Sequence, residues 1–152
     1  GRTKFHEMDR DDIRSVLETN LIGLVEVTHK VIQGMVARDS GHIVNIGSVQ
    51  GVITYPRATI YTASKFGIHG FSECLRMDYF NSGIRVTEVM PGLVQSQFAA
   101  NRWGDAAKAE QFYGEFAARL WPEDVAQAVL YAIAQPAHVD VGQVVLQPGG
   151  KN

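Results

Sequence analysis

A tyrosine and a lysine four positions apart are the side chains of this sequence best suited to chemistry. They begin and end the segment Tyr61-Thr62-Ala63-Ser64-Lys65. In a helix, this spacing places both groups on one face, one turn apart. A free tyrosine has a pKa of about 10, and a lysine cation held nearby favours the phenolate, which makes proton transfer accessible near neutral pH. The same pair is also compatible with an ordinary surface helix, so its neighbours decide the interpretation.

Two further polar residues are candidates to join this pair. The apolar run at 42–47 predicts a buried strand that ends at Ser48. Ligands of open α/β sheets bind just beyond the carboxyl ends of strands, although such a serine can also merely satisfy backbone groups. Asn20 interrupts the apolar stripe of an expected helix, where a buried amide needs partners. For Asn20, a structural and a functional role are equally compatible with the sequence.

In this order, Asn20, Gly47-Ser48 and Tyr61-Thr62-Ala63-Ser64-Lys65 resemble the active-site tetrad of the short-chain dehydrogenase/reductase family. The segment Met90-Pro91-Gly92-Leu93-Val94-Gln95-Ser96 is similar to the Pro-Gly loop of that family, which lies beside the nicotinamide. The resemblance extends from about Met8 to about Pro148. Within the family, residues 44–48, 91–94 and 135–139 are most similar to the NADP-dependent 3-hydroxy acid, or serine-type, dehydrogenase branch.

The resemblance implies a role for each member of the tetrad. Tyr61 would exchange a proton with the substrate oxygen, and Lys65 would lower the pKa of Tyr61 and bind the ribose hydroxyls of the cofactor. Ser48 would donate a hydrogen bond to the same substrate oxygen, where charge develops. Asn20 would hold a water molecule that connects Lys65 to solvent.

The resemblance also implies a nicotinamide cofactor, NADP, with NAD as the alternative because the region that selects between them is absent from this chain. The expected cofactor-binding residues are Tyr61, Lys65, Pro91, Gly92, Val94 and Ser96. The expected substrate-binding residues are Ser48, Tyr61 and Arg102, the last for a carboxylate. We therefore expect a small 3-hydroxy acid, or the matching oxo compound, under an aromatic-rich segment at 95–121 that could move as a lid.

The alternation of apolar patterns predicts an α/β fold with a parallel sheet. Helices are expected at 9–38, 59–81 and 122–134, an amphipathic segment at 106–118, and strands at 42–48, 84–90 and 141–147. A Rossmann-type fold also needs a Gly-rich phosphate turn after its first strand, and no such turn is present here. We therefore expect residues 1–152 to be the catalytic carboxyl-terminal portion of one doubly wound domain, with an unpaired edge at its first strand.

Composition limits the other function classes. A net charge of −2 argues against nucleic acid or an anionic membrane surface as partner. The single Cys74 excludes an internal disulfide framework and is expected to be packed. The five histidines lack metal-ligand spacing, so no metal site is expected. Without a signal peptide or a long apolar run, we expect a cytoplasmic protein.

The sequence leaves alternatives open for both assembly and function. The small residues Ala63, Gly67 and Gly70 would admit a second helix, so we expect a homo-oligomer, a dimer or tetramer built through the two long helices. In the alternative, both helices merely cover their own sheet. An alternative function is a non-catalytic fragment or pseudo-enzyme that acts as an assembly piece, and a third is a helical binding module with Tyr61 and Lys65 on its surface.

Overall fold

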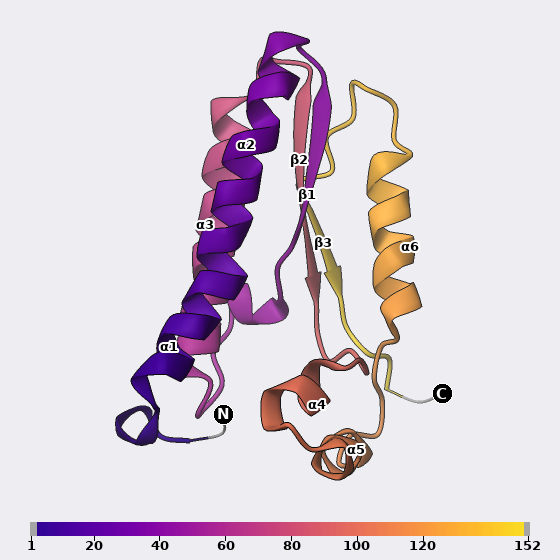
Figure 1. Cartoon of the computed structure of the whole chain (residues 1–152). Coiled ribbons are helices and arrows are strands. Elements are labelled where there is room, and N and C mark those ends of the chain that lie inside the picture. Colours follow the sequence, from indigo (N-terminus) through magenta and orange to yellow (C-terminus); the bar gives the residue numbers. More distant parts are fainter. Residues whose placement is uncertain (1–2, 151–152) are drawn as a thin grey trace.

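A computed structural model of the chain describes residues 3–150, apart from the side chains of Arg102 and Trp103. Its centre is a sheet of three parallel strands, β1 (Gly41–Ile46), β2 (Ile84–Pro91) and β3 (Gln143–Leu146), in the order β1-β2-β3 (Figure 1). Seven of the eight residues of β2 are buried, as expected for a central strand covered on both faces.

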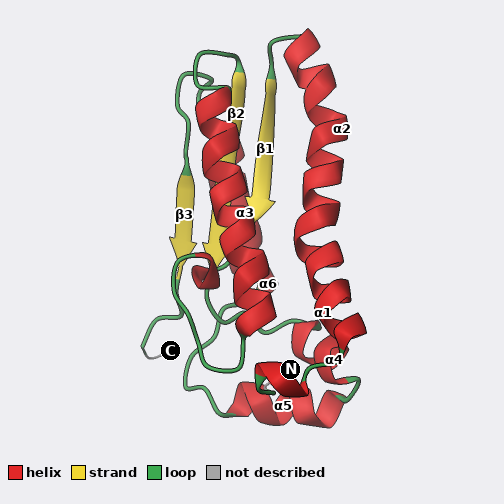
Figure 2. Cartoon of the chain, turned by 90° about the vertical axis from the view of Figure 1, so that its left-hand side faces the viewer, coloured by secondary structure: helices red, strands yellow, loops and turns green. Residues whose placement is uncertain are grey.

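The helices expected at 9–38 and 59–81 lie on one face of the sheet (Figure 2). The helix expected at 9–38 is present as α1 (Arg10–Leu17), a π-helical turn (Glu18–Ile22) and α2 (Gly23–Ala37). The Asp9 side chain accepts a hydrogen bond from the Asp11 N–H and caps the first turn. Beside this helix lies α3 (Thr59–Asp78), which follows the short 3₁₀ turn Val49–Gly51. The helix predicted at 59–81 therefore ends three residues early.

The opposite face of the sheet is covered by α6 (Pro122–Ile133) (Figure 1). Pro122 suits the first turn, where its missing N–H costs no hydrogen bond. The acids Glu123 and Asp124 interact favourably with the positive end of the helix dipole. Helices on both faces of a parallel sheet confirm the predicted fold class, an α/β fold of the doubly wound Rossmann type. Among the described residues, β1 pairs only with β2, so its other edge is unpaired, as the sequence predicted.

A helical cap lies beyond the carboxyl ends of the strands. It consists of α4 (Phe98–Trp103) and α5 (Ala106–Gly114), separated by Gly104, whose φ of 61° is the left-handed conformation that ends α4 (Figure 1). Both ends of the cap are tied together, because the Gln95 N–H donates to the Leu120 carbonyl and the Leu120 N–H donates to the Leu93 carbonyl, each at 2.8 Å. The amphipathic segment predicted at 106–118 is thus helical only to Gly114.

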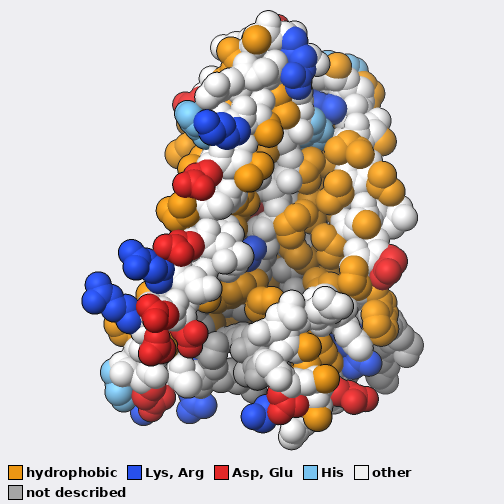
Figure 3. Space-filling model, viewed as in Figure 1, with side chains coloured by type: hydrophobic (Ala, Val, Ile, Leu, Met, Phe, Trp, Pro, Cys, Tyr) orange, Lys and Arg blue, Asp and Glu red, His pale blue; other side chains and the backbone are white. Residues whose placement is uncertain are grey.

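The apolar surface is unevenly distributed. A core cluster of Ile32, Ile43 and Ile84 joins α2 to the first two strands. Figure 3 shows hydrophobic side chains gathered over the side of the molecule where α6 lies. Cys74 is exposed, so the packed thiol expected there is wrong. Within residues 3–150, no helix is long and apolar enough to cross a membrane.

Candidate active site

A cavity of about 980 Å³ opens at the carboxyl ends of the strands, between the sheet and the helical cap. The end of β1, the first turns of α3, the loop after β2 and the cap all contribute to its wall. Three of the four residues of the expected tetrad, Ser48, Tyr61 and Lys65, line it directly. The structure therefore gathers these residues, which are up to 17 positions apart in the sequence, around one space.

Ser48 is buried two residues beyond the end of β1. Its Oγ accepts a hydrogen bond of 3.1 Å from the Gln50 N–H and lies 3.4 Å from the Pro91 carbonyl oxygen, a long contact for a hydroxyl donor. The serine thus satisfies local backbone groups and also faces the cavity. A substrate oxygen could replace the weak Pro91 contact as acceptor without loss of the Gln50 bond.

Tyr61 and Lys65 lie one turn apart on α3, as their spacing predicted. The Lys65 Nζ is 5.8 Å from the centre of the Tyr61 ring and donates a hydrogen bond of 3.0 Å to the Ile46 carbonyl oxygen. Burial lowers the pKa of Lys65, and the negative charge of Glu88 opposes that shift. The Tyr61 ring also packs against Phe98 of the cap, with 5.6 Å between ring centres.

Asn20 lies in the π-helical turn between α1 and α2 and reaches α3 instead of the cavity wall. Its Nδ2 donates to the Ser64 Oγ at 3.1 Å, and that hydroxyl donates to the Tyr61 carbonyl oxygen at 2.7 Å. Ser64 is fully buried, whereas Asn20 is partly exposed. Single π-helical turns occur frequently at functional sites. Here the turn brings the Asn20 amide to the residue next to Lys65.

The Pro-Gly loop after β2 presents backbone groups to the cavity, which Pro91, Gly92, Val94 and Ser96 all line. A Cβ atom at Gly92 would lie 2.9 Å from the Gln147 Oε1 and 3.3 Å from the Leu146 carbonyl oxygen, so glycine lets the loop pack closely against the end of β3. Val94 forms an isolated parallel bridge with Leu120 whose hydrogen bonds use the Leu93 carbonyl and the Gln95 N–H. That bridge leaves the N–H and carbonyl of Val94 itself available to a ligand.

Ser96 is held by the cap. The Tyr113 hydroxyl accepts from the Ser96 N–H at 3.3 Å and donates to the Ser96 carbonyl at 3.2 Å. The Ser96 Oγ accepts from the Phe98 N–H at 3.2 Å, which leaves its own hydrogen free of that bond. Tyr113 is buried, so this aromatic residue fixes the cap, whereas Phe98, Phe112 and Phe116 line the cavity.

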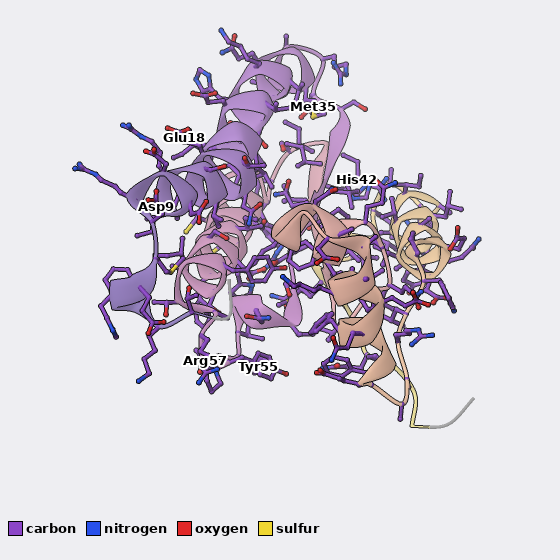
Figure 4. All side chains as sticks on the ribbon, turned by 60° about the horizontal axis from the view of Figure 1, so that its bottom comes forward. Asp9, Glu18, Met35, His42, Tyr55 and Arg57 are labelled. Carbon is purple, nitrogen blue, oxygen red and sulfur yellow. The ribbon has the colours of Figure 1, made fainter. Side chains whose placement is uncertain are left out.

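Arg102, the residue expected to bind a carboxylate, belongs to α4, but its side chain lies outside the described part of the structure. Sequence reasoning missed a second arginine. Arg57 lines the cavity in the loop before α3, beside Tyr55 and Pro56 in the chain, and has a φ of 63°. A left-handed backbone conformation is uncommon for a residue with a long side chain, and it costs energy. Figure 4 shows Tyr55 and Arg57 next to each other at the bottom of the view.

The other cations are engaged elsewhere or lie apart. Arg119 donates to the Tyr113 carbonyl at 3.0 Å, and Lys108 forms an ion pair with Asp105. Among the described side chains of the cavity wall, Arg57 and Lys65 are the two cations. Across residues 3–150, no group of three or more His, Cys, Asp or Glu side chains is arranged to hold a metal ion.

Comparison with known proteins gives a consistent set of relatives. A family model described as short chain dehydrogenase matches residues 1–107. The chain is 39% identical over 150 residues to an Escherichia coli protein named NADP-dependent 3-hydroxy acid dehydrogenase YdfG, which covers 97% of this chain and 60% of that protein. It is 38% identical over 144 residues to sulfoacetaldehyde reductase 2 of Chromohalobacter salexigens, covering 93% of this chain and 57% of the relative.

Solved structures agree with these sequence relatives. The closed form of a serine dehydrogenase complexed with NADP+ superimposes with a TM-score of 0.92 at 39% identity, covering 96% of this chain and 59% of the other. A serine dehydrogenase from Escherichia coli gives a TM-score of 0.78 at 34% identity. The chain thus spans about 60% of the length of the curated relatives that it matches.

Proposed function

The chain belongs to the short chain dehydrogenase family, and from that membership we propose that residues 1–152 are the carboxyl-terminal, catalytic portion of an NADP-dependent oxidoreductase. Its substrate is a small 3-hydroxy acid or the matching oxo acid or semialdehyde. The observation that carries this proposal is the arrangement of Ser48, Tyr61 and Lys65 around one cavity, with Asn20 connected to the same helix. We call the protein that contains this chain the full-length enzyme.

The residues present fit the nicotinamide end of the cofactor. The backbone groups of Val94 that its bridge leaves unused, together with the Ser96 hydroxyl, offer donors and acceptors for a carboxamide. Pro91 and Gly92 shape the adjacent wall, and Tyr61 and Lys65 offer a phenol and an ammonium group for ribose hydroxyls. When bound, the cofactor supplies the hydride chemistry, and the protein supplies position and electrostatics.

The tetrad residues then handle the proton. In the reductive direction Tyr61 donates its phenolic proton to the carbonyl oxygen of the substrate, and in the oxidative direction it accepts the proton of the alcohol. Ser48 donates a hydrogen bond to the same oxygen as charge develops there. The Lys65 cation favours the phenolate form of Tyr61. Asn20 contacts the first turns of α3 through Ser64, and in this proposal it would retain a water molecule beside Lys65.

A negatively charged substrate needs a cationic partner besides Lys65. Arg57 and Arg102 are the two candidates, one in the loop before α3 and the other in the cap. Several relatives carry names that refer to acids, among them a 3-hydroxy acid dehydrogenase and a sulfoacetaldehyde reductase. These names and the two arginines support an anionic substrate over a neutral alcohol.

The enzyme would be a cytoplasmic homo-oligomer, with the long helices α2 and α3 at the subunit contact. A Cβ atom at Gly70 would meet nothing within 4 Å, and Ala63 is exposed, so both leave room for another helix. Gly67 serves a different purpose, because a Cβ atom there would lie 2.8 Å from Leu21 of the same chain. That member of the expected small-residue strip therefore admits the chain's own helix.

The test is a spectrophotometric assay of the purified full-length enzyme with NADP and 3-hydroxypropanoate. We expect NADP-dependent turnover that falls by about 100-fold when Ser48 is replaced by alanine, since one donor to the developing charge is lost. Tight NADP binding without turnover on any hydroxy acid, amino alcohol or aldehyde of this size would support the alternative, a non-catalytic assembly piece.

A further inference from the structure

A carboxyl group is buried directly beneath the proposed active site. Glu88 lies in the middle of β2, between its strand neighbours Asn45 and Gln143, and its side chain is fully inaccessible to solvent. A buried carboxylate is costly unless it is paired and hydrogen-bonded. The mechanism described above gives this group no role, although it lies on the same face of β2 as Ile84, Val86 and Met90.

His69 and Gly47 both accommodate the Glu88 carboxyl group, one through a hydrogen bond and the other by leaving space. The His69 Nδ1 on α3 lies 2.7 Å from the Glu88 Oε2, and an ionised carboxylate can only accept in this bond. The Oε1 has no hydrogen-bond partner among the described residues. A Cβ atom at Gly47 would overlap this Oε1, so the absence of a side chain at Gly47 creates the space that the carboxyl group occupies.

The Glu88 Oε1 and the Lys65 ammonium group contact adjacent residues at the end of β1. Lys65 bonds to the carbonyl of Ile46, and the Glu88 Oε1 packs against the next residue, Gly47. His69 follows Lys65 by one turn of α3. The position of a Cβ atom at Gly51 would lie 3.1 Å from the Lys65 carbonyl and 3.3 Å from the His69 Cβ, so both residues pack against one point of the turn after Ser48.

The electrostatic effects within this group oppose one another. Burial raises the pKa of Glu88, while the hydrogen bond from His69 opposes that rise. Burial lowers the pKa of Lys65, and the Glu88 charge opposes that fall. The third charged group that acts on the pKa of Glu88 is Glu73, which is itself paired with Arg76 at 2.7 Å. The side chains that act on Glu88 all belong to α3, and among them Lys65 is the one that lines the cavity.

We propose that Glu88, held as a carboxylate by His69 and given its space by Gly47, is a positioning residue that keeps Lys65 in its ammonium form. The inference rests on the proposed function, because it acts through Lys65 on the proton exchange of Tyr61. It assigns a use to a buried pair, His69 and Glu88, that lies outside the cavity wall. It also explains why a glycine must precede Ser48.

The test compares pH profiles of kcat/KM for alcohol oxidation by the full-length enzyme and its Glu88→Gln variant. Glutamine keeps the shape and removes the charge, so Lys65 loses its proton at lower pH. We expect the alkaline fall in kcat/KM to move by about one pH unit toward lower pH. The matched control is Ser72→Ala, which removes a buried hydrogen bond of 2.9 Å to Asn45, next to Glu88, without a change of charge. Its profile is expected to change in height only.

A second variant keeps the proposal testable if Glu88→Gln does not fold. His69→Ala removes the donor to the carboxylate, and we expect a shift in the same direction and no larger. The double variant is expected to shift no further than Glu88→Gln alone, since both changes act through one group. An unmoved alkaline limb in the folded variants would overturn the proposal. A wild-type enzyme without NADP-dependent turnover would instead contradict the proposed function.

Discussion

The ammonium group of Lys65 donates a hydrogen bond of 3.0 Å to the carbonyl oxygen of Ile46, the last residue of β1. This bond ties the first turns of α3 to the end of the strand that carries Ser48. The lysine is thus placed by the sheet and by its own helix together. Its amine keeps two further protons with which to bind a ligand.

Replacement of Lys65 by methionine is expected to damage two properties at once. Methionine retains the apolar stem and removes the cation, so both proton exchange and ribose binding suffer. We expect kcat to fall by about 100-fold and the Kd for NADP, measured by fluorescence titration, to rise by about tenfold, the loss of one charged hydrogen bond.

Lys4→Met is the control for loss of a surface cation, since Lys4 is exposed and lies outside the cavity wall. It is expected to leave both quantities unchanged. An unaltered Kd for NADP in Lys65→Met would remove the ribose-binding half of the assignment.

The roles of Arg57 and Arg102 are tested by comparing activity on a charged and a neutral substrate of the same size. Wild type, Arg57→Ala and Arg102→Ala are assayed on 3-hydroxypropanoate and on 3-hydroxypropanamide, which has the same size without the charge. Loss of a charge-assisted hydrogen bond is expected to lower kcat/KM for the acid by about tenfold or more and to spare the amide.

Arg10→Ala, an exposed arginine outside the cavity wall, is the control. If both variants lose the two substrates equally, neither arginine recognises a carboxylate. A neutral alcohol or ketone would then be the better substrate hypothesis.

The proposed helix contact predicts a loss of assembly in Gly70→Leu. The leucine would project into open space in one chain and into the second subunit in an oligomer. We expect a smaller sedimentation coefficient in analytical ultracentrifugation. Gly114→Leu is the matched control, because a Cβ atom at Gly114 also meets nothing within 4 Å but lies in the cap. An oligomer that survives Gly70→Leu would contradict this interface.

His42 predicts a pH dependence of stability. Burial lowers the pKa of His42, helped by the positive charge of Arg85, and its Nε2 lies 2.8 Å from the Thr87 Oγ1. The unfolded chain, with a histidine pKa of about 6.5, then binds more protons than the folded chain. The contribution to the free energy of unfolding is therefore fully present above that unfolded pKa and is lost as pH falls from it through the lower pKa of the folded chain.

We expect urea denaturation of the full-length enzyme to show a larger loss of stability between about pH 7.5 and about pH 5 than in His42→Gln, since glutamine does not titrate in this range. Equal losses in both proteins would show that His42 does not contribute.

Much of the fold could be predicted because apolar periodicity and chain breakers act locally. Pro122, Glu123 and Asp124 predict the start of α6, and the apolar runs before Ser48 and Pro91 predict two strands. The tetrad positions came from a motif whose spacing has a geometric meaning, one helical turn between Tyr61 and Lys65.

The remaining features depend on tertiary contacts. The π-helical turn at Asn20 has the same apolar periodicity as an α-helix and is defined by its bond to Ser64 on another helix. The left-handed backbone of Arg57 has no signal in a residue type that rarely adopts it. Glu88 did leave a signal, since it falls on the same face of β2 as Val86 and Met90, where an apolar residue is expected.

The most direct test of the account is Tyr61→Phe in the full-length enzyme, with Tyr55→Phe, another tyrosine of the cavity wall, as the control. The change removes one hydroxyl and keeps the ring that packs against Phe98. We predict that turnover falls by about 100-fold or more, the usual contribution of a general acid, while the Kd for NADP and the activity of Tyr55→Phe stay close to wild type. Retention of more than about a tenth of the activity by Tyr61→Phe would contradict the assignment of Tyr61 as the proton donor.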